Sequence, residues 1–198
     1  MHQQNIANAG ASDVEWVADL IGEAFQPLDA TAWLVPDPGA RARVLSRNFA
    51  IFVEHALRYG EVDVLADRTA AALWLPVRDD VEPPAPDDYE RRQREACGEW
   101  TDNFVVLDAL FAANHPHGSH DHLAFLAVRP DVQGQGRGSE LLRHHHRALD
   151  ATGQAAFLEA SSTGSRDLYR RHGYAELGEA YALPNGALFW PMWREPLS

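Results

Sequence analysis

The segment Val128-Arg-Pro130-Asp-Val-Gln133-Gly-Gln-Gly136-Arg-Gly138 is the most informative part of this chain. It follows an apolar run, Leu123 to Val128, and it opens a segment whose apolar residues have helical spacing. Glycines add little side-chain bulk, so successive backbone N–H groups can close around an anion. The helix behind the loop adds unpaired N–H groups and the positive end of its dipole. The stretch therefore predicts a pyrophosphate-binding loop between a strand and a helix.

Two common nucleotide-binding loops do not fit this sequence. A dinucleotide-binding loop needs Gly-x-Gly-x-x-Gly, whereas the glycines here stand at positions 134, 136 and 138. A Walker loop needs a Gly-Lys-Ser/Thr ending, and the chain contains no lysine. The pyrophosphate must therefore belong to another ligand.

The loop resembles the acyl-CoA signature of the GNAT N-acetyltransferases, Gln/Arg-x-x-Gly-x-Gly/Ala. A second segment carries the other half of the resemblance, because these enzymes commonly show Asn-x-x-Ala-x-x-x-Tyr followed by Gly-Phe. Here Ser162 and Ser165 stand at the asparagine and alanine positions, while Tyr169 and Gly173-Tyr174 keep the rest. The C-terminal half is most similar to puromycin-type small-molecule acetyltransferases. The resemblance covers residues 120 to 194 well, and the first 115 residues only through the order of elements.

The resemblance implies acetyl-CoA as the acyl donor and a set of residues that hold it. The loop would bind the pyrophosphate, and the preceding strand would present main-chain groups to the pantetheine arm. One N–H near Leu126 or Ala127 would polarise the thioester carbonyl. The expected cofactor-binding residues are Leu126, Ala127, Val128, Gln133, Gly134, Gln135, Gly136, Arg137, Gly138, Ser162, Ser165 and Tyr169.

Transfer of an acetyl group from a thioester to an amine needs a base for the amine proton and an acid for the thiolate. Tyr169 is expected to protonate the sulfur, since phenol and thiol pKa values differ by only about 1.5 units. Glu159, at the end of an expected strand, is the first candidate for the base and for an acceptor contact. His120 and His122 are the alternatives. Trp33 is expected to line the acceptor pocket.

The bulk properties limit the class of protein. The chain has 198 residues, 45% of them hydrophobic, which predicts a single domain over 1–198. A net charge of −12 argues against nucleic acid as a partner and is compatible with a cationic amine. No apolar stretch is long enough for a bilayer, and one cysteine agrees with a reducing compartment. We expect a cytoplasmic protein, monomeric or homodimeric, and the exclusive use of arginine suggests a bacterial source.

Histidines cluster in two places, at positions 115 to 122 and at 144 to 146. Imidazole is a common zinc ligand, but neither cluster has thiolates and the first lies in a Pro-Gly loop. His145 falls on the apolar stripe of its helix and is expected to be partly packed, with His144 and His146 pointing to solvent. No metal site is predicted.

The expected fold is an α/β (α+β) GNAT fold: a mixed, mostly antiparallel sheet of about six to seven strands flanked by helices. Ser12 is expected to cap a first helix, and Pro27 to Pro38 to form a loop. Strands are expected at 5–9, 62–66, 69–75, 122–128, 155–160, 174–183 and 187–194, and helices at 12–25, 39–59, 88–113 (broken near 98 or 101), 136–152 and 165–172. An acidic, proline-rich surface loop is expected from Asp79 to Pro86.

The sequence thus predicts an acetyl-CoA-dependent N-acetyltransferase that acts on a primary amine of a small molecule. Two alternatives stay open. One is a catalytically silent acyl-CoA-binding regulatory module, and the other is a peptide or protein N-acetyltransferase.

Overall fold

The structure is a computed structural model that describes residues 6–78 and 84–197. Within these residues eight strands form one sheet in the order β1-β2-β3-β4-β5-β8-β6, and β7 pairs with β8. All neighbouring strands are antiparallel except β4 and β5, which are parallel. The strands are β1 (Ile6–Asn8), β2 (Glu61–Leu65), β3 (Ala70–Val77), β4 (His120–Val128), β5 (Ala155–Ala160), β6 (Ala175–Glu176), β7 (Tyr181–Ala182) and β8 (Leu188–Arg194).

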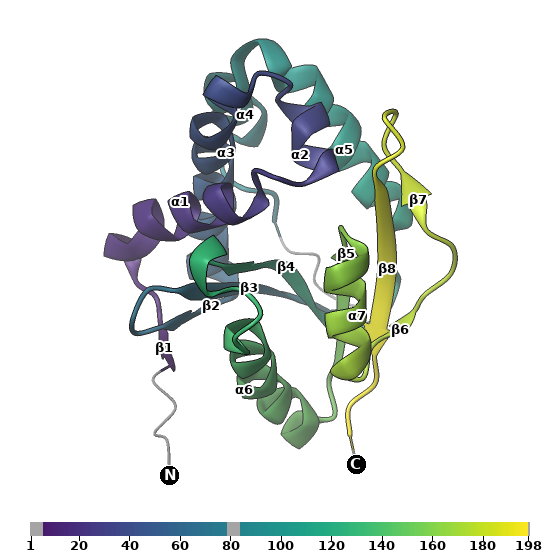
Figure 1. The fold of residues 1–198 in the computed structure, drawn as a ribbon. Helices are drawn as coiled ribbons and strands as arrows, with labels where there is room; N and C mark the ends of the chain where they lie inside the picture. Colours follow the sequence, from purple (N-terminus) through teal and green to yellow (C-terminus); the bar gives the residue numbers. More distant parts are fainter. Residues whose placement is uncertain (1–5, 79–83, 198) are drawn as a thin grey trace.

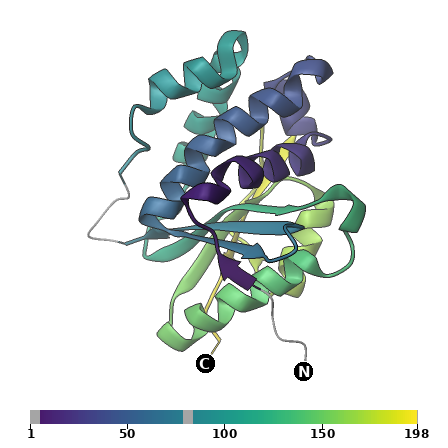
Figure 2. The ribbon, with the colours of Figure 1, turned by 90° about the vertical axis from the view of Figure 1, so that its left-hand side faces the viewer.

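Helices cover both faces of the sheet (Figures 1 and 2). On one face, α1 and α3 pack on β2, β3 and β4, and α2, α4 and α5 extend that layer. On the other face, α6 and α7 pack on the central strands. The helices are η1 (Ala11–Asp13), α1 (Val14–Phe25), α2 (Asp29–Leu34), α3 (Pro38–Tyr59), α4 (Tyr89–Cys97), η2 (Gly98–Trp100), α5 (Thr101–Asn114), η3 (Pro130–Val132), α6 (Arg137–Thr152) and α7 (Thr163–Arg171).

Strand alternation divides the core into these two layers. On β2, Val62 and Val64 belong to the layer under α1 and α3, whereas Leu65 belongs to the layer under α6. Because successive side chains of a strand point to opposite faces, Asp63 points toward α6, where it is fully buried. A carboxylate thus points into the otherwise apolar layer between the sheet and α6.

The strands β4 and β5 diverge soon after they meet. Their pairing runs only from His120 opposite Ala155 to His122 opposite Phe157. Beyond this point the edge of β4 faces no strand among the described residues. The register between β3 and β4 also shifts, since Leu73 lies opposite Phe125 and Trp74 opposite Leu123. The extra residue in β4 is a bulge, which bends the strand near the point where its pairing with β5 ends.

Two long helices begin and end where their sequences allow. The Asp37 side chain accepts a hydrogen bond from the Gly39 N–H at 2.9 Å and Pro38 occupies the first turn, so α3 begins there. Helix α6 lies between Gly136 and Gly153, whose φ angles are +85° and +66°. Glycine adopts this left-handed conformation at little cost, so both ends of α6 are set by sequence.

The expected fold class is confirmed, with some local corrections. The single strand expected at 174–183 is wrong, because Gly178 at φ +82° separates β6 from β7. This division gives eight strands instead of six to seven. The expected loop from Pro27 to Pro38 contains the short helix α2.

The cap expected at Ser12 is also wrong. Asp13 performs the local capping, since its carboxylate accepts from the Gly10 N–H at 2.9 Å and from the Trp16 indole N–H at 2.8 Å. The acidic loop expected at Asp79 to Pro86 lies largely outside the described residues. None of the helices in the described part of the chain has the length and apolar character to cross a membrane.

Candidate active site

The glycine loop joins η3 to α6 at the end of β4 (Figure 1). Gly134 and Gly136 have φ angles of +75° and +85°. Among the described residues, no acceptor pairs with the backbone N–H groups of Gly134, Gln135 and Gly136. The loop is exposed, so these donors and the first N–H groups of α6 form a surface that an anion can reach.

Side chains around the loop hold its shape. The Gln133 side chain donates to the Val128 carbonyl at 3.0 Å, and Arg137 forms an ion pair with Asp67 at 2.8 Å. Gly138 is buried against β4: a Cβ there would lie 3.4 Å from Leu126 Cδ2. Gln133 and Arg137 thus brace the loop through side chains, while Gln135 is exposed.

The β4 residues expected to meet the donor lie beside the divergence of the strands. Leu126 and Val128 contribute to the layer under α6, and Ala127 is buried in the opposite layer. From Leu123 onward, the edge of β4 that pairs with β5 farther back has no neighbouring strand in the described residues. This leaves main-chain groups of β4 available to an extended ligand, in the manner of an added strand.

Ser162 and Ser165 form a reciprocal cap at the start of α7. The Ser165 N–H donates to Ser162 Oγ, and the Ser162 N–H donates to Ser165 Oγ, both at 3.1 Å. These contacts give both residues a structural role in starting α7. The expected contact of either with CoA stays a prediction.

Tyr169, on α7, is 8% exposed and packs edge-on against Tyr174, with ring centres 5.8 Å apart. Within the described residues its hydroxyl has no hydrogen-bond partner. Burial raises the pKa of Tyr169 above its ordinary value. The gap between the pKa of this phenol and that of a thiol is therefore wider than the sequence suggested.

Glu159 and His122 form a pair at the point where β4 leaves β5. Glu159 Oε2 lies 2.9 Å from His122 Nε2, and their side chains are 6% and 20% exposed. The other Glu159 oxygen, Oε1, is buried without a hydrogen-bond partner in the described residues. A carboxylate and an imidazole in contact can pass a proton between them, so the two candidate bases act as one unit.

His120, the other alternative base, is sealed in the core. Its Nδ1 contacts the Gly118 carbonyl at 2.9 Å, and its ring packs between Phe157 and Trp193. Burial lowers the pKa of His120 below its ordinary value. The structure therefore favours His122 over His120 as the partner of Glu159.

The sequence did not single out two further residues at this place. Tyr181, on β7, has a buried hydroxyl, and burial together with the Glu159 carboxylate raises its pKa. His115 packs against the rings of His122 and Phe157. Burial, and then His122, lowers the pKa of His115 to about 4. The histidine cluster was a signal for His115, whereas nothing local in the sequence marked Tyr181.

Trp33 lies on α2 and lines a cavity of about 550 Å³. The turn before β8 supplies the opposite wall, through Asn185 to Ala187, and the Asn185 side chain donates to the Asp29 carbonyl at 3.0 Å. An apolar cluster then connects Trp33 to Tyr181 and includes Leu107, Leu110, Phe111, Leu183 and Phe189. This apolar cluster thus extends from Trp33 to Tyr181, whose side chain lies near Glu159.

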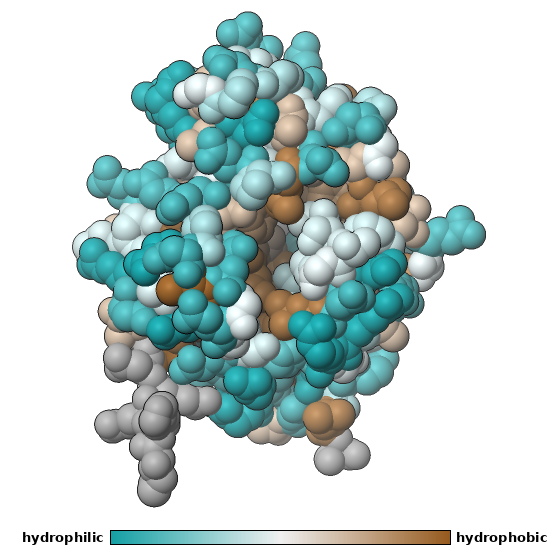
Figure 3. Space-filling view, in the orientation of Figure 1, coloured by the Kyte–Doolittle hydropathy of each residue, from teal (hydrophilic) through white to brown (hydrophobic). Residues whose placement is uncertain are grey.

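A space-filling view shows that this face of the molecule is hollowed (Figure 3). The hollow lies between the α1 layer and α7, in front of the place where β4 and β5 diverge in Figure 1. Its interior is apolar, and its rim is hydrophilic. The arrangement combines an exposed glycine loop, a strand edge without a partner strand in the described residues, and a carboxylate–imidazole pair.

Comparison with known proteins agrees with this geometry. Residues 100–176 match the family model of the acetyltransferase (GNAT) domain. The structure of histone acetyltransferase HPA2 and related acetyltransferase from Corynebacterium glutamicum is similar with a TM-score of 0.73 and 27% identity, over 98% of this chain and 96% of that one.

Two more distant structures have the same fold. One is a mosquito arylalkylamine N-acetyltransferase (like 5b), with a TM-score of 0.59 and 15% identity over 96% of this chain and 98% of that one. The other is an agmatine N-acetyltransferase, with a TM-score of 0.59 and 17% identity over 96% and 99%. The two kinds of comparison agree: residues 100–176 match the acetyltransferase (GNAT) domain, and the whole chain shares its fold with solved acetyltransferases.

Proposed function

We propose that this protein transfers the acetyl group of acetyl-CoA to a primary amine of a small molecule by direct attack on the thioester. The observation that carries the proposal is the Glu159–His122 pair, 2.9 Å apart at the divergence of β4 and β5. In this reaction a C–N bond forms, the thioester C–S bond breaks, and one proton moves from nitrogen to the base.

Each part of the site has one task in this proposal. The loop from Gln133 to Gly138 holds the pyrophosphate through backbone N–H groups, and the edge of β4 from Leu126 to Val128 orients the pantetheine arm. These residues fit the donor, because the loop donors have no protein acceptor in the described residues. A main-chain N–H of β4 stabilises the developing oxyanion.

Proton transfer falls to the residues around the hollow. Glu159 takes the proton of the attacking amine, directly or through His122. Tyr169 donates a hydrogen bond to the departing sulfur. The thiolate then takes a proton from water, and Glu159 releases the proton of the amine to solvent. Trp33 and the apolar cluster that continues to Tyr181 hold the body of the acceptor.

A small acceptor is favoured by the shape of the site. The cavity beside Trp33 is about 550 Å³, which suits a small molecule. The net charge of −12 attracts a cationic amine at long range. Small amines are also the acceptors named for two of the structural neighbours.

The test is release of CoA thiol from acetyl-CoA in the presence of a panel of aromatic amines, polyamines and short peptides. We expect turnover with at least one small amine and none with the peptides. Turnover with peptides alone would favour the protein-acetylating alternative.

Tyr169→Phe separates an enzyme from a silent acyl-CoA-binding module. Loss of the hydroxyl should lower kcat about 10²-fold, the lower range for a positioned proton donor, while acetyl-CoA affinity stays the same. A wild type that binds acetyl-CoA but acetylates none of the panel would support the silent module instead.

A further inference from the structure

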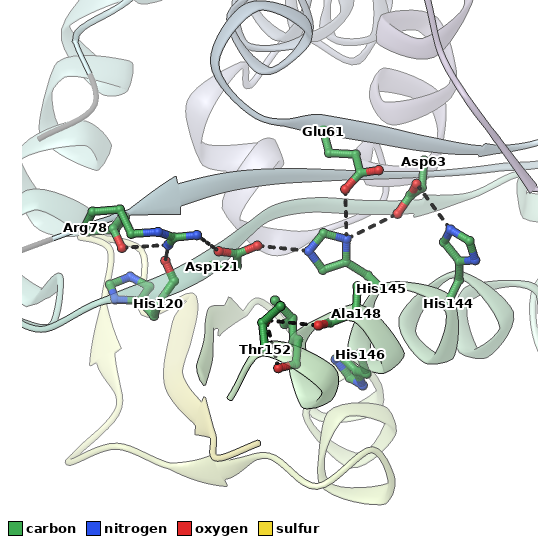
Figure 4. A network of polar contacts seen from close by, with 12 residues as sticks. Glu61, Asp63, Arg78, His120, Asp121, His144, His145, His146, Ala148 and Thr152 are labelled. Carbon is green, nitrogen blue, oxygen red and sulfur yellow. Dashed lines mark hydrogen bonds and ion pairs between the residues drawn. The ribbon is translucent and has the colours of Figure 1, made fainter. Parts of the chain in front are cut away.

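A second polar cluster lies on the opposite side of the sheet, between β2, β4 and α6 (Figure 4). His145 of α6 stacks on Trp74, with ring centres 4.0 Å apart, and it is 5% exposed. Three carboxylates surround its ring: Asp121 on one side, and Glu61 and Asp63 on the other. The sheet separates this cluster from the Glu159–His122 pair, because Asp121 and His122 point to opposite faces of β4.

The two nitrogens of His145 have different surroundings. Nε2 lies 3.1 Å from Asp121 Oδ2, a hydrogen-bond distance. Nδ1 lies 3.5 Å from Glu61 Oε2 and 3.5 Å from Asp63 Oδ2, and neither contact has hydrogen-bond geometry. These three ligand atoms lie within 4.8 Å of one another.

Such spacing is what a shared metal ion requires. Two atoms bound at about 2.0–2.2 Å to one tetrahedral ion lie about 3.3–3.6 Å apart. The two measured distances from Nδ1 fall in this range, whereas they are too long for good hydrogen bonds.

Asp63 gives an independent reason to place a cation here. It is 0% exposed, and neither of its carboxylate oxygens has a hydrogen-bond partner in the described residues. A buried carboxylate without donors is costly unless a cation compensates it. His144, on the same helix as His145, places its Nε2 3.9 Å from Asp63 Oδ1.

The ligands are also held by outer contacts. Asp121 accepts from Arg78 at 3.0 Å and lies against His145 Nε2, so it fixes which ring nitrogen points at Asp63. The Asn8 side chain donates to Glu61 Oε1 at 2.7 Å and leaves Oε2 for the cluster. Glu61 is 39% exposed, so the rim of the cluster is open to an entering ion.

We infer that Glu61, Asp63 and His145 form a binding site for a divalent first-row transition metal ion, in which His145 Nδ1 is a ligand and Asp121 orients the imidazole. The ion links β2 to α6, and water completes its coordination. Its role is structural, because the sheet separates the three metal ligands from Glu159 and His122. The imidazole ligand selects zinc over magnesium, which prefers oxygen ligands alone.

The experiment is titration of chelator-treated full-length protein with Zn²⁺, read by calorimetry and by thermal unfolding. We expect one Zn²⁺ per chain and a rise in Tm of several degrees at saturation, with no comparable effect of Mg²⁺. His145→Gln and Asp63→Asn should abolish both signals. Glu61→Gln, at the exposed rim where folding is least disturbed, should weaken zinc binding at least tenfold.

Two matched variants control for the other histidines. His146→Gln changes the adjacent residue of α6, whose ring contacts Tyr174 instead, and His117→Gln changes an exposed residue of the other cluster. Both should bind zinc as the wild type does. Asp121→Asn should weaken binding about 10–100-fold without abolishing it.

Three results would overturn the site. They are the absence of zinc binding by the wild type, undiminished binding by folded Glu61→Gln and His145→Gln variants, and equal affinity for Mg²⁺. The last result would mean that the acidic groups attract any divalent cation without an imidazole ligand.

Discussion

Asp121 and His122 are consecutive residues of β4, and each makes a carboxylate–imidazole contact on its own face of the sheet. Asp121 meets His145 of α6 at 3.1 Å, and His122 meets Glu159 of β5 at 2.9 Å. The side chains of both pairs are mostly buried, from 5% to 20% exposed. The pairs differ in their position relative to the divergence of β4 and β5. Only the Glu159 pair lies where the missing strand contact leaves room for reacting groups.

Burial and pair chemistry therefore do not by themselves identify a catalytic residue here. The Asp121 pair is held under α6 between Trp74, Arg78 and two further carboxylates, where it can fix structure or bind an ion. Replacing the carboxylate of each pair by the isosteric amide breaks that pair and leaves the other intact.

The largest expected effect is that of Glu159→Gln on turnover. Loss of the base should lower kcat about 10³-fold, within the range for general base catalysis, while Tm changes little because the amide keeps the shape. Asp121→Asn should do the reverse, lowering Tm by several degrees with less than a tenfold change in kcat. Steady-state kinetics and thermal unfolding of both variants check this. Similar losses of kcat in the two variants would remove the distinction between the faces.

The sequence predicts the parts of this arrangement that depend on residues close together in the chain. The sequence alone indicated the glycine loop, a helix ending at Thr152 and a short helix at 165–172, because these elements depend on local residues. It did not indicate that Ser162 caps α7. His145 was expected to be partly packed, which is confirmed, since it is 5% exposed. His146 was expected to point to solvent, which is wrong, because it is buried and contacts the Tyr174 hydroxyl at 3.0 Å.

Long-range contacts could not be read in the same way. Glu61 and Asp63 are about 80 residues from His145 in the sequence, and only the sheet topology brings them together. Tyr181 reaches Glu159 because β7 pairs with β8, which in turn pairs with β5. The sequence had suggested one continuous strand there, so it gave no position for Tyr181.

A smaller effect is expected from a substitution in α6, which carries the glycine loop at its start and His145 in its middle. Gly136→Ala places a Cβ at φ +85°, which should cost about 1–2 kcal/mol and disturb the loop N–H groups. We expect the KM for acetyl-CoA to rise about tenfold, with zinc affinity unchanged. Gly153→Ala is the control for stability, since it places a Cβ at φ +66° at the other end of α6, away from the loop. A tenfold loss of zinc affinity in the Gly136→Ala variant would show that a change at the start of α6 also disturbs His145.

The smallest expected effect concerns acid stability on the active-site face. Burial, and then His122, lowers the pKa of His115 from about 6.5 to about 4. The unfolded chain therefore takes up a proton below pH 6.5 that the folded protein does not accept until about pH 4, so stability decreases as pH falls through this window. At pH 5 the loss from this group is at most about 2 kcal/mol. His115→Gln removes the titrating group, and its free energy of unfolding should fall less between pH 7 and 5 than that of the wild type, as measured by urea unfolding. A variant as acid-sensitive as the wild type would mean that His115 is solvated in solution. It would then belong to the open rim of the hollow and not to the packed wall behind His122.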